Sequence, residues 1–328
     1  MTLPQLTEAG PFLTDGGLET CLIFESGIDL AEFAAFPLLD SESGRTALTA
    51  YYRPFLSLAA EHGVGFVLDT PTWRANPDWG ARLGYDTAAL DALNGRAVEF
   101  ARDLAVTERA ARVVVNGVIG PRGDGYAVGA AMSPAEAEDY HGAQVRAFAD
   151  AGTDMITVVT MTYAAEAIGA TRAATAAGLP IVVSFTVETD GALPSGQPLG
   201  EAITEVDAAT GAGPAYFMVN CAHPTHLAPA LEDGAPWLTR VRGLRSNASR
   251  LSHAELDEAE TLDRGDPAEW AALHAPLRSV FDLRVVGGCC GTDDEHVAAL
   301  AHALVVGAEQ DRAERRDDDQ TAASDPSS

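Results

Sequence analysis

The chain has 328 residues, 47% of them hydrophobic, and its 48 acidic and 21 basic side chains give a formal net charge of −27. Such acidity argues against nucleic acids and anionic membranes as partners. No lysine occurs anywhere in the sequence, which excludes Schiff-base aldolases, pyridoxal-phosphate enzymes and Walker A nucleotide-binding loops.

The first residues of the chain show no basic segment followed by an apolar core, and no apolar run approaches the length of a membrane span. Four cysteines in a chain of this length do not make a secreted disulfide framework. We therefore expect a cytoplasmic protein without a membrane partner, whose thiols stay reduced and are free to bind a metal.

Short apolar runs recur along the chain, and each leads into polar or glycine residues. They lie at residues 12–14, 64–68, 112–118, 155–159, 181–185, 215–219, 241–244 and 283–286. The runs are continuous rather than alternating, which is typical of parallel strands buried on both faces. The sequence thus predicts eight such strands.

Alanine-rich amphipathic segments separate these runs. Residues 135–151 have helical spacing after Ser133-Pro134, a suitable N-cap and N1 pair, and residues 163–177 end at Gly178. Eight strand–helix units in this length predict an α/β protein that forms one (β/α)8 TIM barrel. A doubly wound open sheet is the alternative, but Asp15-Gly16-Gly17 does not match its glycine-rich phosphate loop.

Two segments stand apart from this pattern. Residues 245–266 are polar and predict a long excursion from the barrel after the seventh strand. Residues 308–328 are charged and rich in small side chains, which predicts a disordered acidic tail. The barrel domain is accordingly expected to span residues 1–307.

Three cysteines follow two of the predicted strands. Cys221 comes directly after the sixth run, and the adjacent pair Cys289 and Cys290 follows the eighth. A lone buried cysteine is usually only a small hydrophobic residue, and a disulfide between adjacent cysteines would be strained. In a barrel, however, both groups end at the same face, so three thiolates can meet there.

Three thiolates favour zinc among the common metals and leave one tetrahedral position open, as a catalytic zinc requires. His223 and His226 lie near Cys221 and are alternative ligands, although we expect them to lie behind the ligands or at the surface. Cys21 is a possible fourth ligand that would close the site, but its position predicts a place inside the first helix.

The charge of such a centre sets its chemistry. Three thiolates on Zn²⁺ leave a net charge of −1, and a substrate thiol that enters the open position loses its proton. The resulting thiolate stays nucleophilic and can attack a methyl group on a sulfonium or ammonium donor. The predicted partners are therefore a small-molecule thiol and a cationic methyl donor.

These motifs resemble the homocysteine S-methyltransferase family over nearly the whole chain, from Asp15-Gly16-Gly17 through Asn220-Cys221 to Gly287-Gly288-Cys289-Cys290-Gly291. The resemblance implies a zinc-containing (β/α)8 barrel with Cys221, Cys289 and Cys290 as ligands. It also implies that Asp15 binds the amino group of homocysteine. Thr72, in a loop after the second strand, and Asn247, after the seventh, fall at positions that imply substrate contact.

One position departs from the family pattern. Many members carry a Glu-Thr pair after the fourth strand, whose glutamate also holds the substrate amine, whereas this chain has Val159-Thr160. Losing that charged partner would cost about 1.5–3 kcal/mol. Glu188 is a possible replacement in substrate binding; Glu166 is another, although its position favours a helix.

The sequence therefore predicts a zinc-dependent methyltransferase that converts homocysteine to methionine. The expected donor is S-methylmethionine or S-adenosylmethionine rather than betaine. Two alternatives remain open: a methyltransferase for a different small thiol on the same zinc site, and a non-catalytic zinc-binding or redox-sensing protein.

Overall fold

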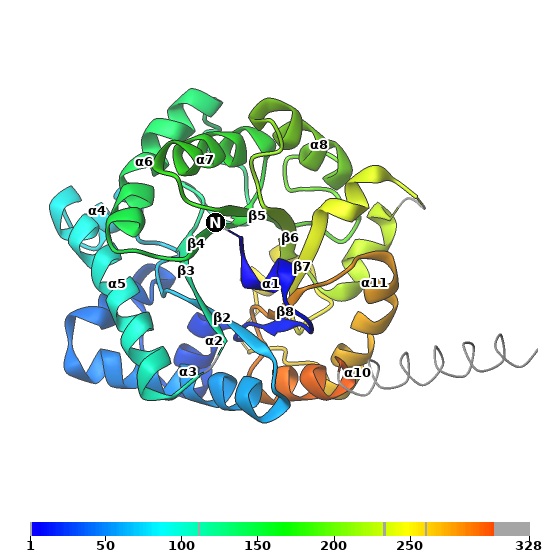
Figure 1. The fold of residues 1–328 in the computed structure, drawn as a ribbon, viewed down its shortest axis with the longest axis horizontal. Helices are drawn as coiled ribbons and strands as arrows, with labels where there is room; N and C mark the ends of the chain where they lie inside the picture. Colours follow the sequence, from blue (N-terminus) through cyan, green and yellow to red (C-terminus); the bar gives the residue numbers. More distant parts are fainter. Residues whose placement is uncertain (1, 111, 232–233, 260, 305–328) are drawn as a thin grey trace, which may run out of the picture.

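The computed structural model describes residues 2–110, 112–231, 234–259 and 261–304. Eight parallel strands close into a barrel in which each strand pairs with the next and the last pairs with the first (Figure 1). The strands are Phe12–Leu13 (β1), Gly65–Asp69 (β2), Val113–Ile119 (β3), Met155–Met161 (β4), Ile181–Phe185 (β5), Tyr216–Asn220 (β6), Val241–Ser246 (β7) and Val285–Gly288 (β8). The predicted TIM barrel is confirmed, and the pairing of β1 with β8 rules out the open sheet.

Helices form a ring around the strands (Figure 1). The α-helices are Pro4–Thr7 (α1), Leu18–Thr20 (α2), Glu42–His62 (α3), Pro77–Arg82 (α4), Thr87–Thr107 (α5), Pro134–Asp150 (α6), Ala164–Ala177 (α7), Leu199–Thr210 (α8), His253–Asp257 (α9), Pro267–Ala272 (α10) and His274–Val280 (α11). Residues 294–304 are also helical. None of the helices in the described part of the chain combines the length and apolarity that a bilayer crossing requires.

The two helices predicted in detail begin and end for the expected reasons. Ser133 caps α6 through a capping box with Glu136, and Pro134 occupies the first turn. Gly178 ends α7 in the left-handed conformation, with a φ of 71°, which glycine adopts without a steric penalty.

Several strands run further than their apolar runs. β2 includes Asp69, β6 includes Asn220, and β7 includes Arg245 and Ser246. The polar excursion expected to begin at Arg245 therefore begins after Ser246. Polar residues can remain in these strands because their side chains bond one another at the carboxyl end of the barrel, as described below.

The opposite end of the barrel is apolar and closed. A buried cluster there includes Phe12, Val67, Met155 and Tyr216. The short helix α1 lies across this end in Figure 1, and its Gln5 donates a hydrogen bond to the Tyr216 hydroxyl at 3.3 Å. The carboxyl ends of the strands are thus the end at which a site can open.

The predicted domain boundary at residue 307 and the predicted acidic tail at 308–328 lie outside the described residues.

The packing of β3 against α6 allows a prediction about the stability of the protein. A Cβ atom on Gly117, in β3, would lie 2.7 Å from the ring of Phe148 in α6, so Gly117→Ala should destabilise the protein by about 1–3 kcal/mol. Gly95 in α5 has open space around its Cα, and Gly95→Ala should be neutral or stabilising by up to about 1 kcal/mol. Equilibrium denaturant unfolding measures both; an equal effect of the two substitutions would contradict this packing.

Candidate functional site

Three sulfur atoms meet at the carboxyl end of the barrel. Cys221 follows β6, Cys289 and Cys290 follow β8, and both strands pair with β7 between them. The Cys221 Sγ lies 2.9 Å from the Cys289 Sγ and 3.5 Å from the Cys290 Sγ, and all three sulfurs lie within 4.8 Å of one another. The predicted convergence of the two strand ends is therefore present in the structure.

The backbone at Cys221 is held in an unusual conformation. Its φ is 55°, in the left-handed region, which costs a non-glycine residue about 1 kcal/mol or more. The Cys221 carbonyl accepts hydrogen bonds from Asn247 Nδ2 at 3.1 Å and His253 Nε2 at 2.6 Å, with Thr186 Oγ1 at 3.4 Å. His253 Nδ1 lies 3.0 Å from the Glu188 carboxylate, so these side chains together fix the turn that presents the sulfur.

The thiols do not titrate alike. Hydrogen bonds from the Cys221 and Cys290 thiols hold the pKa of Cys289 well below its usual value. The pKa of Cys221 is raised, first by its hydrogen bonds to Cys289 and Cys290 and then by burial. The Tyr126 hydroxyl lies 3.1 Å from the Cys221 Sγ and 3.6 Å from the Cys290 Sγ, and burial raises the pKa of Tyr126 so that this phenol stays protonated.

The three cysteines are a suitable donor set for a thiophilic metal. Around a tetrahedral zinc ion, with Zn–S bonds of about 2.3 Å, two ligand sulfurs lie roughly 3.8 Å apart. The Cys221–Cys290 separation of 3.5 Å is close to this value, and the Cys221–Cys289 separation of 2.9 Å would open by a small side-chain rotation. Within the described residues, this is the group of three or more metal-binding side chains that lies close enough to hold an ion.

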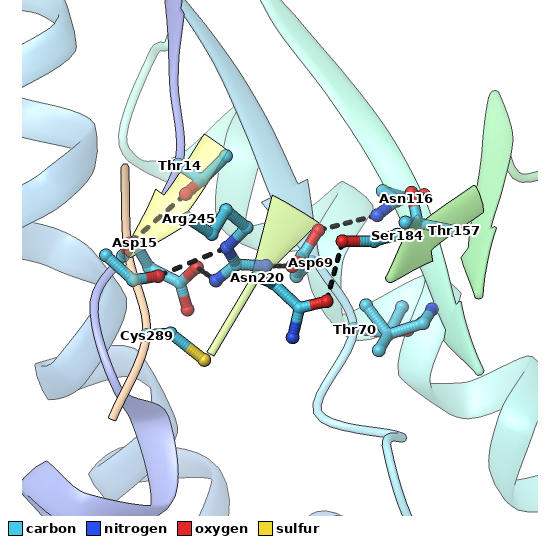
Figure 2. Close-up of polar contacts among 12 residues, drawn as sticks. Thr14, Asp15, Asp69, Thr70, Asn116, Thr157, Ser184, Asn220, Arg245 and Cys289 are labelled. Carbon is cyan, nitrogen blue, oxygen red and sulfur yellow. Dashed lines mark hydrogen bonds and ion pairs between the residues drawn. The ribbon is translucent and has the colours of Figure 1, made fainter. Parts of the chain in front are cut away.

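An arginine occupies the centre of the site beside the thiols. Arg245, near the end of β7, forms ion pairs with Asp15 after β1 and Asp69 at the end of β2 (Figure 2). Tyr51 also donates a hydrogen bond to Asp15 at 3.0 Å. Burial alone would lower the pKa of Arg245, but the charges of Asp69 and Asp15 reverse this and raise it. Burial raises the pKa of Asp15 to about 7.

A layer of polar side chains lies next to this ion cluster inside the barrel (Figure 2). Asn116 donates to Asp69 at 2.7 Å and accepts from Thr157 at 3.0 Å. Asn220 accepts from Ser184 at 2.6 Å and donates to Thr160 at 3.0 Å. Because these buried groups satisfy one another, the polar strand ends cost little to bury.

A small cavity of about 80 Å³ lies between the ion cluster and the thiols. Asp15, Glu19, Val159 and Arg245 line it together with the three cysteines. Glu19 forms no ion pair among the described residues, and burial raises its pKa to about 7. The charge of Arg74 opposes this shift. Among the carboxyl groups that line this cavity, Glu19 is therefore the one that forms no ion pair with a described residue.

A second cavity of about 320 Å³ adjoins the first. Thr20, Phe33, Trp73, Tyr126 and Cys290 line both cavities. The second is bounded on its outer side by the segment that follows β7, including α9. Cys290 is thus the cysteine that lines both cavities.

The remaining predicted site residues occupy varied positions. Thr72 lines the first cavity, but its hydroxyl is buried between the Val118 carbonyl and Thr70, at 2.7 Å from each. Asn247 lines the second cavity. Glu188 lines neither, and it reaches the site only through His253. Substrate contacts by these residues stay predictions.

Other cysteine and histidine alternatives lie apart from the sulfur cluster. Cys21 follows α2 in a helical turn, and its thiol faces the Thr292 carbonyl at 3.4 Å. His223 and His226 are buried rather than exposed, and their rings are tilted against each other with centroids 5.8 Å apart. Glu166 lies in α7, as expected, and pairs with His141 at 3.0 Å.

Sequence reasoning missed four residues of the site. Tyr126 lies in a glycine-rich loop and Glu19 in a short helical turn, and neither carries a recognisable motif. His253 lies within the excursion after β7. Arg245 offered one signal: a charged residue directly after an apolar strand of a predicted barrel lies at the active-site end.

The chain is similar to known proteins over most of its length. Residues 12–304 match the family model described as homocysteine S-methyltransferase. The chain is 27% identical over 251 residues to the Escherichia coli protein named homocysteine S-methyltransferase. This match covers 70% of this chain and 77% of that protein. It is 30% identical over 162 residues to the methionine synthase of Mycobacterium leprae.

The methionine synthase match covers 47% of this chain and only 13% of that much longer protein. Among solved structures, the metallated form of the homocysteine methyltransferase MmuM from Escherichia coli superposes with a TM-score of 0.71. It shares 23% identity and covers 90% of this chain and 97% of its own. At 23% identity, this structural similarity supports the fold alone.

The sulfur cluster predicts a metal-binding result. Replacing Cys221, Cys289 or Cys290 with serine should lower affinity for zinc or cobalt by more than about 100-fold, because loss of a supporting contact alone costs about 10–100-fold. Cys21→Ser is the matched control and should bind metal like the wild type. Metal content and cobalt–thiolate absorbance of reduced protein measure this; equal metal binding by all four variants would contradict the assignment.

The ion cluster predicts a stability result. Arg245→Met leaves Asp15 and Asp69 buried without a cation and should cost about 3–5 kcal/mol. Arg242, in the same strand, pairs with Asp282 in a more exposed position, so Arg242→Met should cost less than about 1 kcal/mol. Adding Asp15→Asn and Asp69→Asn to Arg245→Met should restore part of the stability in urea unfolding. A loss no larger than that of the control would show that the cluster is not needed.

Proposed function

The chain belongs to the homocysteine S-methyltransferase family, and on that basis we propose that it transfers a methyl group from a small cationic donor to homocysteine. The main support for this proposal is that Cys221, Cys289 and Cys290 converge beside a cavity, which leaves one side of the sulfur cluster open. The protein is a methyltransferase by its family; the acceptor, the donor and the metal are the subject of the proposal.

We assign Zn²⁺ to the three cysteines. The all-sulfur donor set favours zinc, and the matched Escherichia coli enzyme was solved in a metallated form. A zinc ion held there would stabilise the substrate thiol as its thiolate at neutral pH.

The protein's own residues then orient the reactants. The hydrogen bonds to the Cys221 carbonyl hold its sulfur toward the cavity. The homocysteine sulfur forms a bond to the donor's methyl carbon, and the bond from that carbon to the donor's onium atom breaks. Its electron pair stays with the donor, which leaves neutral. The products are methionine, the demethylated donor and the proton released from the thiol.

Glu19 is our candidate for the substrate's ammonium partner. It lines the same cavity as Val159, the position at which the resemblance implies a glutamate, and it forms no ion pair among the described residues. Asp15 lines the cavity too, but it is already engaged by Arg245 and Tyr51. A charge-assisted bond to Glu19 is worth about 1.5–3 kcal/mol, enough to replace the missing contact.

The second cavity suits a cationic donor. Phe24, Phe33, Trp73 and Tyr126 line it, and aromatic faces attract onium groups. Cys290 and Tyr126 lie where it meets the first cavity, so a methyl group there faces the sulfur cluster. This supports S-methylmethionine or S-adenosylmethionine as the donor.

One observation favours a second candidate, methyl transfer to a different small thiol. Arg245 neutralises Asp15, and Val159 provides no charge. A thiol without an ammonium group would need no carboxylate partner, and Glu19 would then have another role.

A methyl-transfer assay with homocysteine and each donor tests both candidates. Glu19→Gln should raise the KM for homocysteine by about 10- to 100-fold and leave the KM for 3-mercaptopropanoate, a thiol without an amine, unchanged. Glu8→Gln, at the far end of the barrel, is the control. If Val159→Glu instead sharply improves homocysteine use while Glu19→Gln has no effect, the native acceptor is a different thiol. If no donor gives a methylated product, that result would count against methyl transfer itself.

A further inference from the structure

The hydroxyl group of Tyr126 lies against the sulfur cluster. It is 3.1 Å from the Cys221 Sγ and 3.6 Å from the Cys290 Sγ, and within the described part of the chain these two sulfurs are its hydrogen-bond partners. A cysteine binds a metal as its thiolate, which has no proton to donate. When the cluster holds a metal, the Tyr126 hydroxyl must therefore be the donor in both contacts.

The loop that carries Tyr126, residues 120–132, is fixed on the barrel. The Met132 N–H donates a hydrogen bond to the Tyr163 hydroxyl at 3.0 Å. A Cβ atom on Gly125 would lie 2.9 Å from two neighbouring side chains, so glycine lets the chain beside Tyr126 approach the barrel closely. The Tyr126 ring also packs on the His253 ring, with centroids 4.5 Å apart. The phenol is thus held in place at the sulfurs.

The position of Cys290 exposes it to the reaction that we propose. Cys290 is half-buried and lines both cavities, whereas Cys221 is buried. A thiolate is a nucleophile, so Cys290 could itself attack a donor's methyl group. Its Sγ would form a bond to the methyl carbon, the bond from that carbon to the onium atom would break, and the electron pair would leave with the donor. The product is a neutral thioether, a poor metal ligand.

A hydrogen bond from Tyr126 opposes this side reaction. A hydrogen bond to a charged acceptor is stronger than one to a neutral acceptor, and the charge on the sulfur disappears as the methyl group is transferred. The bond from the hydroxyl is therefore stronger before the attack than during it, and an interaction of that kind slows a reaction. The sulfurs that the hydroxyl contacts belong to the protein, so the acceptor's thiolate remains the better nucleophile.

We propose that Tyr126 protects the protein's own sulfurs from methylation: its hydroxyl donates to Cys221 and Cys290 and thereby confines methyl transfer to the thiol of the acceptor. This inference rests on the proposed function, because it supposes a methyl donor beside the cluster. It deepens that function by naming a residue that determines which sulfur is methylated. Cys289 serves as an internal reference, because it is half-buried like Cys290 and the Tyr126 hydroxyl does not bond its sulfur.

The test measures methylation of the protein itself, by intact mass and by fragmentation of the peptides that contain the cysteines. Reduced, zinc-loaded proteins of equal metal content are treated with iodomethane. Tyr126→Phe keeps the ring and removes the hydroxyl, so Cys290 should be methylated about 5- to 50-fold faster than in the wild type, while the rate at Cys289 should change little. Tyr163→Phe is the matched control: it removes a hydroxyl that supports the same loop, and it should behave like the wild type.

Iodomethane needs neither a donor site nor an acceptor, so this test separates the proposal from the proposed reaction. Faster methylation of Cys290 in Tyr126→Phe, in a protein that accepts no onium donor, would support the protection and count against the reaction. Equal rates at Cys290 in the wild type and Tyr126→Phe would overturn the protection and leave the reaction standing. An equal rise at all three cysteines, or the same rise in Tyr163→Phe, would show that Tyr126 only holds the loop and would also overturn the proposal.

Discussion

The left-handed backbone at Cys221 is the constraint on which the sulfur cluster depends. An extended residue there would continue β6, whereas a φ of 55° turns the chain at Cys221, whose sulfur lies beside those of Cys289 and Cys290. The strain persists because two side chains of one other segment donate hydrogen bonds to the Cys221 carbonyl. The excursion after β7 supplies both Asn247 and His253, so this polar segment supports the site rather than merely covering it.

Electrostatics explains why an arginine, rather than any smaller cation, lies at the mouth of the barrel. Asp15 and Asp69 project from different strand ends, and one planar guanidinium can pair with both at once. The same side chain donates to the Gly288 carbonyl at 3.2 Å, next to Cys289. Through these bonds Arg245 joins β2, β7 and β8. Hydrogen bonds from Cys221 and Cys290 are the main cause of the low pKa of Cys289, and the charge of Arg245 adds to it. Arg245 therefore pairs with two buried carboxylates and also favours the thiolate form of a neighbouring cysteine.

The sequence predicts those features of the fold that depend on residues close together along the chain. Continuous apolar runs predicted all eight strands, because parallel strands are buried on both faces, and barrel closure then placed Cys221 beside Cys289. It is less informative where contacts depend on side chains that reach across the barrel. Arg245 pairs with residues 230 and 176 positions away. Its place after an apolar run locates it at the active-site end of the barrel, but nothing local identifies its two partners. Glu19 and Tyr126 were missed for the same reason.

The arrangement of the two cavities bears on how a methyl transfer is kept specific. A cluster open to solvent on all sides would present its thiolate to any electrophile. Here all three cysteines line the first cavity, Cys290 also lines the second, and the two cavities share Tyr126. In the reaction that we propose, charge in the first cavity selects the acceptor and aromatic contact in the second selects the donor. Because displacement at carbon requires nucleophile and leaving group on opposite sides of the methyl group, separate cavities meet a geometric demand that a single pocket of the same volume would meet less well.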